Sequence, residues 1–138
     1  MKIPALYPEG YVQIEAHDTR RDLLVVEVNM HFGSDYVDKR YYTRSTLHDA
    51  NLHEFVEEFD AFILDRSGSP SLAESSHDSC LEFSGSGDDL ARGSAPVMLE
   101  YRFSDVTRGC RFLHTGTLEV NQEYLVQILE GFRRLESG

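Results

Sequence analysis

The chain has 138 residues, of which 41% are hydrophobic and 27% are charged, a balance typical of a folded globular domain. Its 24 acidic residues outnumber its 13 basic ones and give a formal net charge of −11. Such a charge repels nucleic acid and anionic membrane surfaces, so we expect neither as a partner, and it favours a basic protein. The sequence shows no signal peptide and no apolar run of the ~20 residues that a membrane helix needs. We therefore expect one cytoplasmic domain over residues 1–138.

The first half of the chain predicts a lead-in, three strands and a helix. Residues 1–10 contain two prolines and predict an irregular segment. Alternating apolar residues predict strands over 11–16 and 23–32, with a polar turn over 17–22 between them. A tight turn after the second strand predicts a partner strand over 36–44, so the two form a hairpin.

The segment Asp49–Asp65 predicts an amphipathic helix with Asp49 as its N-cap. On a helical wheel the large apolar side chains fall within an arc of roughly 120°; they are Leu52, Phe55, Val56, Phe59, Phe62 and Ile63. The opposite arc carries His53, Glu54, Glu57, Glu58, Asp60 and Asp65. One side of this helix is thus expected to enter the core, and the other to form an acidic surface.

The second half predicts the same kinds of element in the same order. Ser-rich and Gly-rich segments over 67–79 and 85–95 predict flexible loops, and strands are expected over 80–84, 96–104 and 111–120. A helix then starts at Asn121 as its N-cap. Its predicted apolar face consists of Tyr124, Leu125, Ile128, Leu129, Phe132 and Leu135. The two halves together predict an α+β fold: two strand-strand-helix units that form one antiparallel sheet of about six strands, with both helices on one face.

The residue types that carry catalysis or bind metals are present, but their spacing does not assemble a site. His53 and Glu57 share a helix face and supply only two ligands, and no second metal-binding pair accompanies His77 and Cys80. A Cys/His nucleophile pair made of Cys110 and His114 would be separated by about 13 Å along a strand. The sequence therefore predicts no catalytic residue, no metal and no cofactor.

From about Leu23 onward the chain carries the helix NLHEFVEEFDAFI, a Ser/Pro loop, a short strand around LEF, the strand PVMLEYRF, the strand ending in GTLEV and the helix NQEYLVQILEGF. This order of elements resembles that of the WapI-type bacterial immunity proteins and related bacterial families. The resemblance implies a small α+β protein that neutralises a cognate toxin by direct binding, without catalysis. A basic toxin domain would suit the acidic surface of this chain.

We therefore expect a non-enzymatic binding protein, with the following partner-binding residues: Glu54, Glu57, Glu58, Asp60, Glu74, Asp78, Asp88 and Asp89. Two alternatives remain open. The chain could bind a small molecule, or act as an enzyme, in a cavity between sheet and helices lined by polar groups such as Tyr101, His114 or Tyr124. It could also self-associate into a homodimer through an exposed strand edge.

Overall fold

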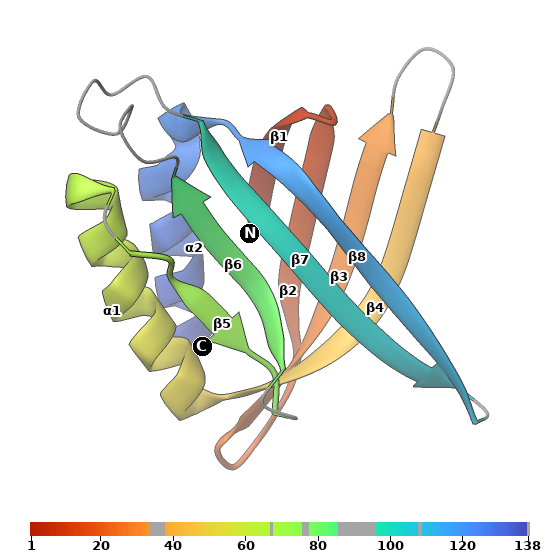
Figure 1. Ribbon diagram of the computed structural model, residues 1–138. Coiled ribbons are helices and arrows are strands. Elements are labelled where there is room, and N and C mark those ends of the chain that lie inside the picture. Colours follow the sequence, from red (N-terminus) through yellow and green to blue (C-terminus); the bar gives the residue numbers. More distant parts are fainter. Residues whose placement is uncertain (34–37, 67, 76–77, 86–95, 108, 138) are drawn as a thin grey trace.

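The structure, a computed structural model, describes residues 1–33, 38–66, 68–75, 78–85, 96–107 and 109–137. It is an α+β fold in which one antiparallel sheet carries two helices, as the sequence predicts (Figure 1). The described strands are β1 (Lys2–Tyr7), β2 (Gly10–Arg20), β3 (Leu23–Gly33), β4 (Asp38–His48), β5 (Ser71–Ala73), β6 (Ser79–Gly85), β7 (Val97–Thr107) and β8 (Cys110–Val120). The helices are α1 (Asp49–Asp65) and α2 (Leu125–Ser137), and a 3-10 turn, η2 (Gln122–Tyr124), precedes α2. The strand order is β4-β3-β2-β1-β8-β7-β6-β5, so the described sheet has eight strands and the prediction of about six is wrong.

The two strands that the sequence did not predict are β1 and β5. The expected irregular lead-in over residues 1–10 contains β1, which pairs with β2 on one side and with β8 on the other. The carbonyl of Pro4 accepts the N–H of Asn121 at 3.2 Å, so the backbone of this residue faces the β8 side and its missing N–H breaks no hydrogen bond to β2. The short strand β5 lies inside the expected loop over 67–79. Of the loop predicted over 85–95, Gly85 ends β6, and the rest lies outside the described residues.

A β-bulge in β2 explains why its second half was predicted as a turn. The pairing with β3 shifts between Ala16 and Asp18, and the strand then continues to Arg20. His17 has no partner in this register, so the alternation of inward and outward residues is interrupted at that point. The turn that does follow is short and consists of Arg21, with a positive φ of 53°, and Asp22.

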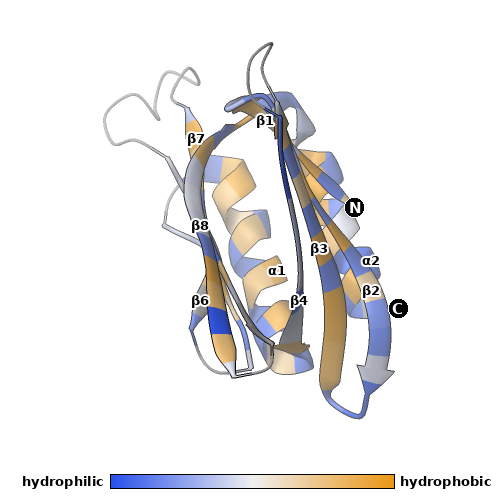
Figure 2. Ribbon diagram, turned by 90° about the vertical axis from the view of Figure 1, so that its right-hand side faces the viewer, coloured by the Kyte–Doolittle hydropathy of each residue, from blue (hydrophilic) through white to orange (hydrophobic). Residues whose placement is uncertain are grey.

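The sheet curls strongly, so that its two halves face each other across the core. Figure 1 shows β7 and β8 crossing in front of β3 and β4, and Figure 2 shows these two halves from the side. Phe32 of β3 stacks on Tyr101 of β7 with ring centroids 6.2 Å apart. Tyr41 of β4 lies 5.1 Å from the ring of His114 in β8. The inner faces of the strands therefore form one continuous core.

The two edge strands of this curled sheet meet close to the start of α1. The N–H of Ser75, which follows β5, donates to the carbonyl of Thr46 in β4 at 2.8 Å. Beside this bond, Ser45 Oγ donates to Glu74 Oε1 at 2.9 Å, and both of these side chains are buried. A backbone bond and a side-chain bond thus tie the two ends of the sheet to each other.

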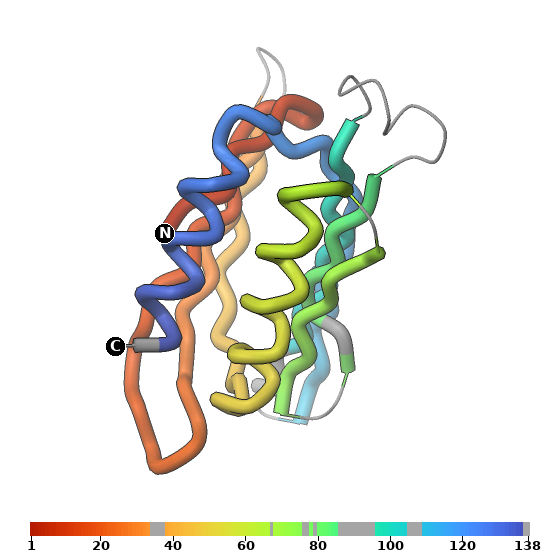
Figure 3. Tube along the Cα trace, turned by 90° about the vertical axis from the view of Figure 1, so that its left-hand side faces the viewer, coloured from red at the N-terminus to blue at the C-terminus, as the bar shows by residue number. Residues whose placement is uncertain are grey.

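Both helices lie side by side on the same side of the sheet (Figure 3). The ring of Phe55 in α1 meets that of Phe132 in α2 with centroids 4.8 Å apart, and Phe59 lies 4.8 Å from Phe83 in β6. The predicted apolar face of α1 is confirmed, since its five buried side chains are Leu52, Phe55, Val56, Phe59 and Phe62. Burial of five such side chains contributes on the order of 10 kcal/mol as an upper estimate, so packing fixes the position of this helix.

The second helix repeats the pattern of the first. The large apolar residues buried in α2 follow the same spacing as those of α1; they are Leu125, Ile128, Leu129 and Phe132. The two halves are therefore alike as predicted, but each contributes four strands and a helix instead of two strands and a helix. Tyr124, which was predicted on the apolar face, is 38% exposed because it lies in η2, before the α-helical spacing begins.

The starts of the two helices differ. Asn121 caps η2 as predicted, and its side chain accepts the N–H of Glu123 at 3.1 Å. The prediction of Asp49 as the cap of α1 is wrong, because His48 occupies that position without a side-chain cap bond. The N–H of Asp49 instead donates to the carbonyl of Asp22 in the β2–β3 turn at 2.9 Å. This bond fixes the start of α1 to the first half of the sheet.

Candidate functional site

The outward side of α1 carries three exposed glutamates, Glu54, Glu57 and Glu58, which we call the acidic ridge. They follow from the same helical spacing that buries the phenylalanines, since residues opposite an apolar face must point to solvent. The side chains of Glu54 and Glu58 form no ion pair or hydrogen bond with any other residue that the structure describes. Glu57 lies 3.2 Å from Nε2 of His53, one turn earlier. The ridge therefore carries carboxylates that the fold leaves largely unneutralised.

A row of ion pairs borders the ridge where α1 and α2 meet. Nδ1 of His53 contacts the carboxylate of Glu136 in α2, and Arg133 lies 3.3 Å from Asp60. The contact with Glu136, followed by the charge of Glu57, raises the pKa of His53 above its ordinary value of 6.5. Asp60, a predicted partner-binding residue, is thus half-exposed and already paired within the chain.

Of the predicted partner-binding residues outside α1, the structure describes Glu74 and Asp78. Glu74 was expected to be an exposed loop acid, but it is 8% exposed and bonded to Ser45. Burial, only partly offset by the Ser45 bond, raises the pKa of this carboxyl above its usual 4.5. Asp78 is exposed in the link between β5 and β6, and its carbonyl accepts the N–H of Glu74 at 2.8 Å. Asp88 and Asp89 lie outside the described residues.

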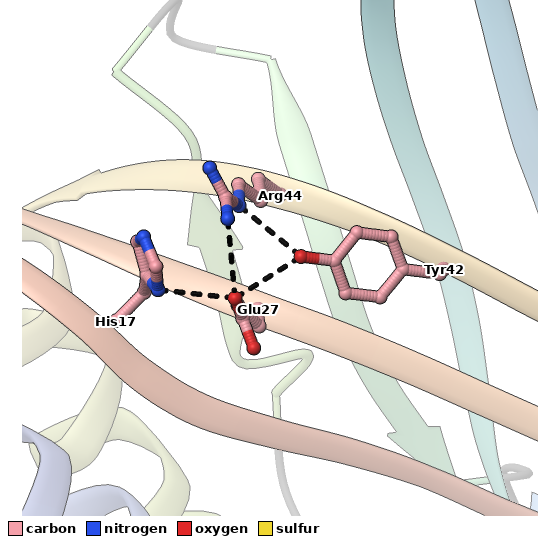
Figure 4. Close-up of polar contacts among 4 residues, drawn as sticks. All are labelled: His17, Glu27, Tyr42 and Arg44. Carbon is pink, nitrogen blue, oxygen red and sulfur yellow. Dashed lines mark hydrogen bonds and ion pairs between the residues drawn. The ribbon is translucent and has the colours of Figure 1, made fainter.

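A polar network on the outer face of β2, β3 and β4 was missed by the sequence reasoning (Figure 4). The carboxylate of Glu27 lies 3.0 Å from His17 and 3.4 Å from Arg44, and it accepts the hydroxyl of Tyr42 at 3.1 Å. Arg44 in turn donates to that hydroxyl at 3.1 Å, a bond that raises the pKa of the guanidinium further and keeps it charged. Strand alternation places Glu27, Tyr42 and Arg44 on one face, and His17 shares that face because it follows Glu15, the residue paired with Glu27, by two positions.

The outer face of the first half of the sheet carries acidic and basic side chains side by side, both in this network and next to it. His31 lies 2.6 Å from Asp38, and Lys2 lies over the ring of Tyr11 at 4.5 Å. Every acid named on this face has a cation beside it, in contrast to Glu54 and Glu58. We interpret these contacts as cross-strand links that stabilise the half-sheet, each contributing modestly at an exposed position.

The space enclosed between the sheet and the helices is too small for a ligand. A cavity of about 10 Å³ lies there, with Ser45, Cys80, Phe103 and Phe132 among its lining residues. Ligand pockets span roughly 300–1,000 Å³. This enclosed cavity is therefore too small for a ligand, whereas a more open groove of about 540 Å³ lies between α2 and the strands β1 and β2, with Tyr124 among its lining residues. Three polar side chains were named for the small-molecule alternative. Tyr101 and His114 are half-buried in ring contacts, and Tyr124 is exposed.

A larger groove opens at the end of the curled sheet away from this cavity, beside β8. It has a volume of about 710 Å³, and we call it the end groove; among its lining residues are Tyr7, Phe32, Lys39, Tyr41, Tyr101 and Thr115. Burial, and then the nearby Tyr41, raises the pKa of Tyr101, so this hydroxyl stays protonated at neutral pH. The sequence does not predict this groove, because it arises where β1 ends beside a longer β8.

Metal-binding and thiol groups are sparse in the part of the chain that the structure describes. No three His, Cys, Asp or Glu side chains among those residues gather closely enough to hold a metal ion. Cys80 is buried, which raises the pKa of its thiol, whereas Cys110 is exposed, and both are free thiols. His77, the residue paired with Cys80 in the sequence analysis, lies outside the described residues.

No family model, curated protein or solved structure matches this chain. Among the described helices, none combines the length and the apolar character that crossing a membrane requires. The interpretation of function therefore rests on the surfaces of the chain itself.

Proposed function

We propose that this chain is a non-enzymatic protein-binding module that binds a basic protein through the acidic ridge of α1. The observation that carries the proposal is the exposure of Glu54 and Glu58 without any partner among the described residues, on a helix whose opposite side is fixed by five buried side chains. Carboxylates in this setting contribute little to folding. They remain available for an interaction with another molecule.

The ridge differs from the other charged surfaces in this respect. On the outer face of the first half-sheet, Glu27 is paired with Arg44 and contacts His17. At the border of the helices, Asp60 is paired with Arg133. A partner that meets either of these surfaces must replace existing contacts, whereas a basic partner gains new ones at the ridge.

The long-range charge of the chain supports the same kind of partner. A net charge of −11 attracts a cationic protein before contact, and an exposed carboxylate cluster on a rigid helix sets the orientation of the encounter. The expected effect lies chiefly on the association rate and weakens as salt screens the charges.

Among basic protein partners, we propose a bacterial toxin domain, so that the chain acts as the immunity protein that neutralises it. This part of the proposal follows the resemblance of element order to the WapI-type immunity proteins. A ridge of carboxylates can occupy a basic cleft on such a toxin and block its substrate.

The experiment is affinity capture from the native host with the purified chain as bait, followed by co-expression. The captured partner should be basic, should arrest growth when it is expressed alone, and should be neutralised when this chain is co-expressed. The variant Glu54→Lys/Glu57→Lys/Glu58→Lys should fold but fail to protect.

The control reverses exposed acids on other surfaces, with Glu15→Lys and Glu100→Lys on the outer faces of the two half-sheets. This variant should still protect, because it leaves the ridge intact. Protection by the ridge variant at the level of the wild type would refute the role of the ridge. A captured partner without toxicity would refute the immunity function while leaving protein binding in place.

A further inference from the structure

We propose that the free edge of β8 binds an extended segment of another polypeptide, which adds to the sheet as a further strand beside the end groove. This surface lies apart from the acidic ridge, and the inference does not depend on the proposed function. It rests on the pairing of β8, on the direction of its backbone groups and on the side chains around it.

The pairing of β8 is complete on one side only. Along its whole length from Cys110 to Val120, β8 pairs with β7 in a continuous register. On its other side β1 pairs only with Val120 and Glu119. No other described strand pairs with β8, so the segment from Cys110 to Leu118 is a free edge over most of the strand.

The direction of the free backbone groups follows from one hydrogen bond. The N–H of Asn121 donates to the carbonyl of Pro4 in β1, so the backbone of position 121 faces the β1 side. Backbone groups alternate in direction along a strand that has no bulge, and the β7–β8 register shows none. Thr117, Thr115 and Leu113 therefore direct their N–H and C=O groups toward the free edge. An added strand can bond to all three residues.

This edge lacks the charged residues that commonly protect exposed strands from pairing. The corresponding free part of β4 carries four charged side chains, Asp38, Lys39, Arg40 and Arg44. The free part of β8 has the sequence CRFLHTGT with Arg111 as its one formally charged residue. Phe112 and Leu113 in this segment are 54% and 50% exposed. The β8 edge is thus open to pairing with another strand, whereas charged side chains disfavour such pairing at the β4 edge.

The end groove lies beside the edge and can receive the side chains of an added strand. Thr115 lines it together with Tyr101 and Tyr7, and the exposed Leu6 stands at its rim. The volume of about 710 Å³ is within the range of sites that hold a ligand. Alternate side chains of an added strand point to the same face as those of β8. A segment with large apolar residues at every second position therefore fits, and basic flanking residues suit the net charge of −11.

The test uses a phage-displayed library of random heptapeptides, selected on the full chain and then measured as synthetic peptides by fluorescence anisotropy. We expect enriched peptides with alternating apolar residues. Their binding should weaken by roughly tenfold or more in Thr115→Pro, because proline removes an N–H that the bound strand uses. The substitution should leave the fold intact, since that N–H points away from β7. The matched control Thr115→Val keeps the N–H and should bind like the wild type.

Three results would overturn the proposal. The first is a library selection without enrichment, and the second is equal binding of the enriched peptides to wild type and Thr115→Pro. The third is a wild-type dimer, seen by light scattering, that Thr115→Pro converts to a monomer, because the edge would then be occupied by a second copy. The ridge variant Glu54→Lys/Glu57→Lys/Glu58→Lys should keep the peptide-binding site, so failure of the proposed function and failure of this inference are separable.

Discussion

Ser45 in β4 donates its hydroxyl to the buried carboxyl of Glu74 at 2.9 Å, and this bond joins the first strand of the sheet order to the residue that follows β5, the last strand. The adjacent backbone bond from Ser75 to Thr46 lies at the same point. A titratable group therefore sits where the two edges of the curled sheet meet. Its protonation state has consequences for stability.

We predict that Glu74→Gln is more stable than the wild type at pH 7. Burial raises the pKa of Glu74 in the folded chain, so the protonated form is favoured there. The stability that this preference contributes is fully present below the unfolded value near 4.5, and it is lost as the pH rises through the folded pKa. Glutamine can still accept from Ser45 without carrying a charge, and it removes this pH dependence. Urea unfolding of both proteins between pH 4 and pH 8 measures the difference.

The control for this prediction is Glu54→Gln, which neutralises an exposed acid on the acidic ridge. We expect its unfolding free energy to follow the wild type across the same pH range. If Glu74→Gln followed the wild type as well, the carboxyl at the edge contact would be ionised without cost and the argument from burial would be wrong.

We predict that Phe59→Ala lowers the free energy of unfolding by ~3–5 kcal/mol. The side chain is fully buried and meets the rings of Phe55, Phe83 and Phe132, so its removal leaves a cavity where α1, α2 and β6 converge. Denaturant unfolding monitored by circular dichroism gives the value. The matched truncation Leu64→Ala on the same helix removes an 83% exposed side chain and should change stability by less than about 0.5 kcal/mol.

The apolar face of α1 could be predicted from the sequence because the helical repeat alone determines which side chains share a face. Other features depend on contacts that no local pattern contains. The strand β5 has three residues and forms only because β6 is beside it. Glu74 reads as a loop acid, and its burial follows from the meeting of two edges far apart in the chain. The end groove likewise arises because β1 is shorter than β8, its neighbour in the sheet. The sequence of either segment alone does not show that the two strands are neighbours.

The histidine at the border of the helices gives a prediction that is measured directly as a pKa. His53 contacts Glu136 and lies near Glu57, and both raise its pKa above 6.5. We predict that Glu136→Gln lowers the pKa of His53 more than Glu57→Gln does, since the Glu136 contact is the larger cause. NMR titration of the ring protons measures each value. An equal response to the two substitutions would contradict the assigned order of the two contacts.

The last prediction concerns Gly116 in β8, which lies opposite Tyr101 in β7. A Cβ added at Gly116 would stand 2.3 Å from the hydroxyl and 2.5 Å from the Cζ atom of Tyr101, too close for any real contact. The tyrosine ring therefore covers the glycine, and Gly116→Ala should destabilise the chain by ~1–3 kcal/mol through overpacking. In the background of Tyr101→Ala the same glycine substitution should cost much less, so the double-mutant cycle should be strongly non-additive. Additive unfolding free energies across the four proteins would show that the ring does not occupy this position.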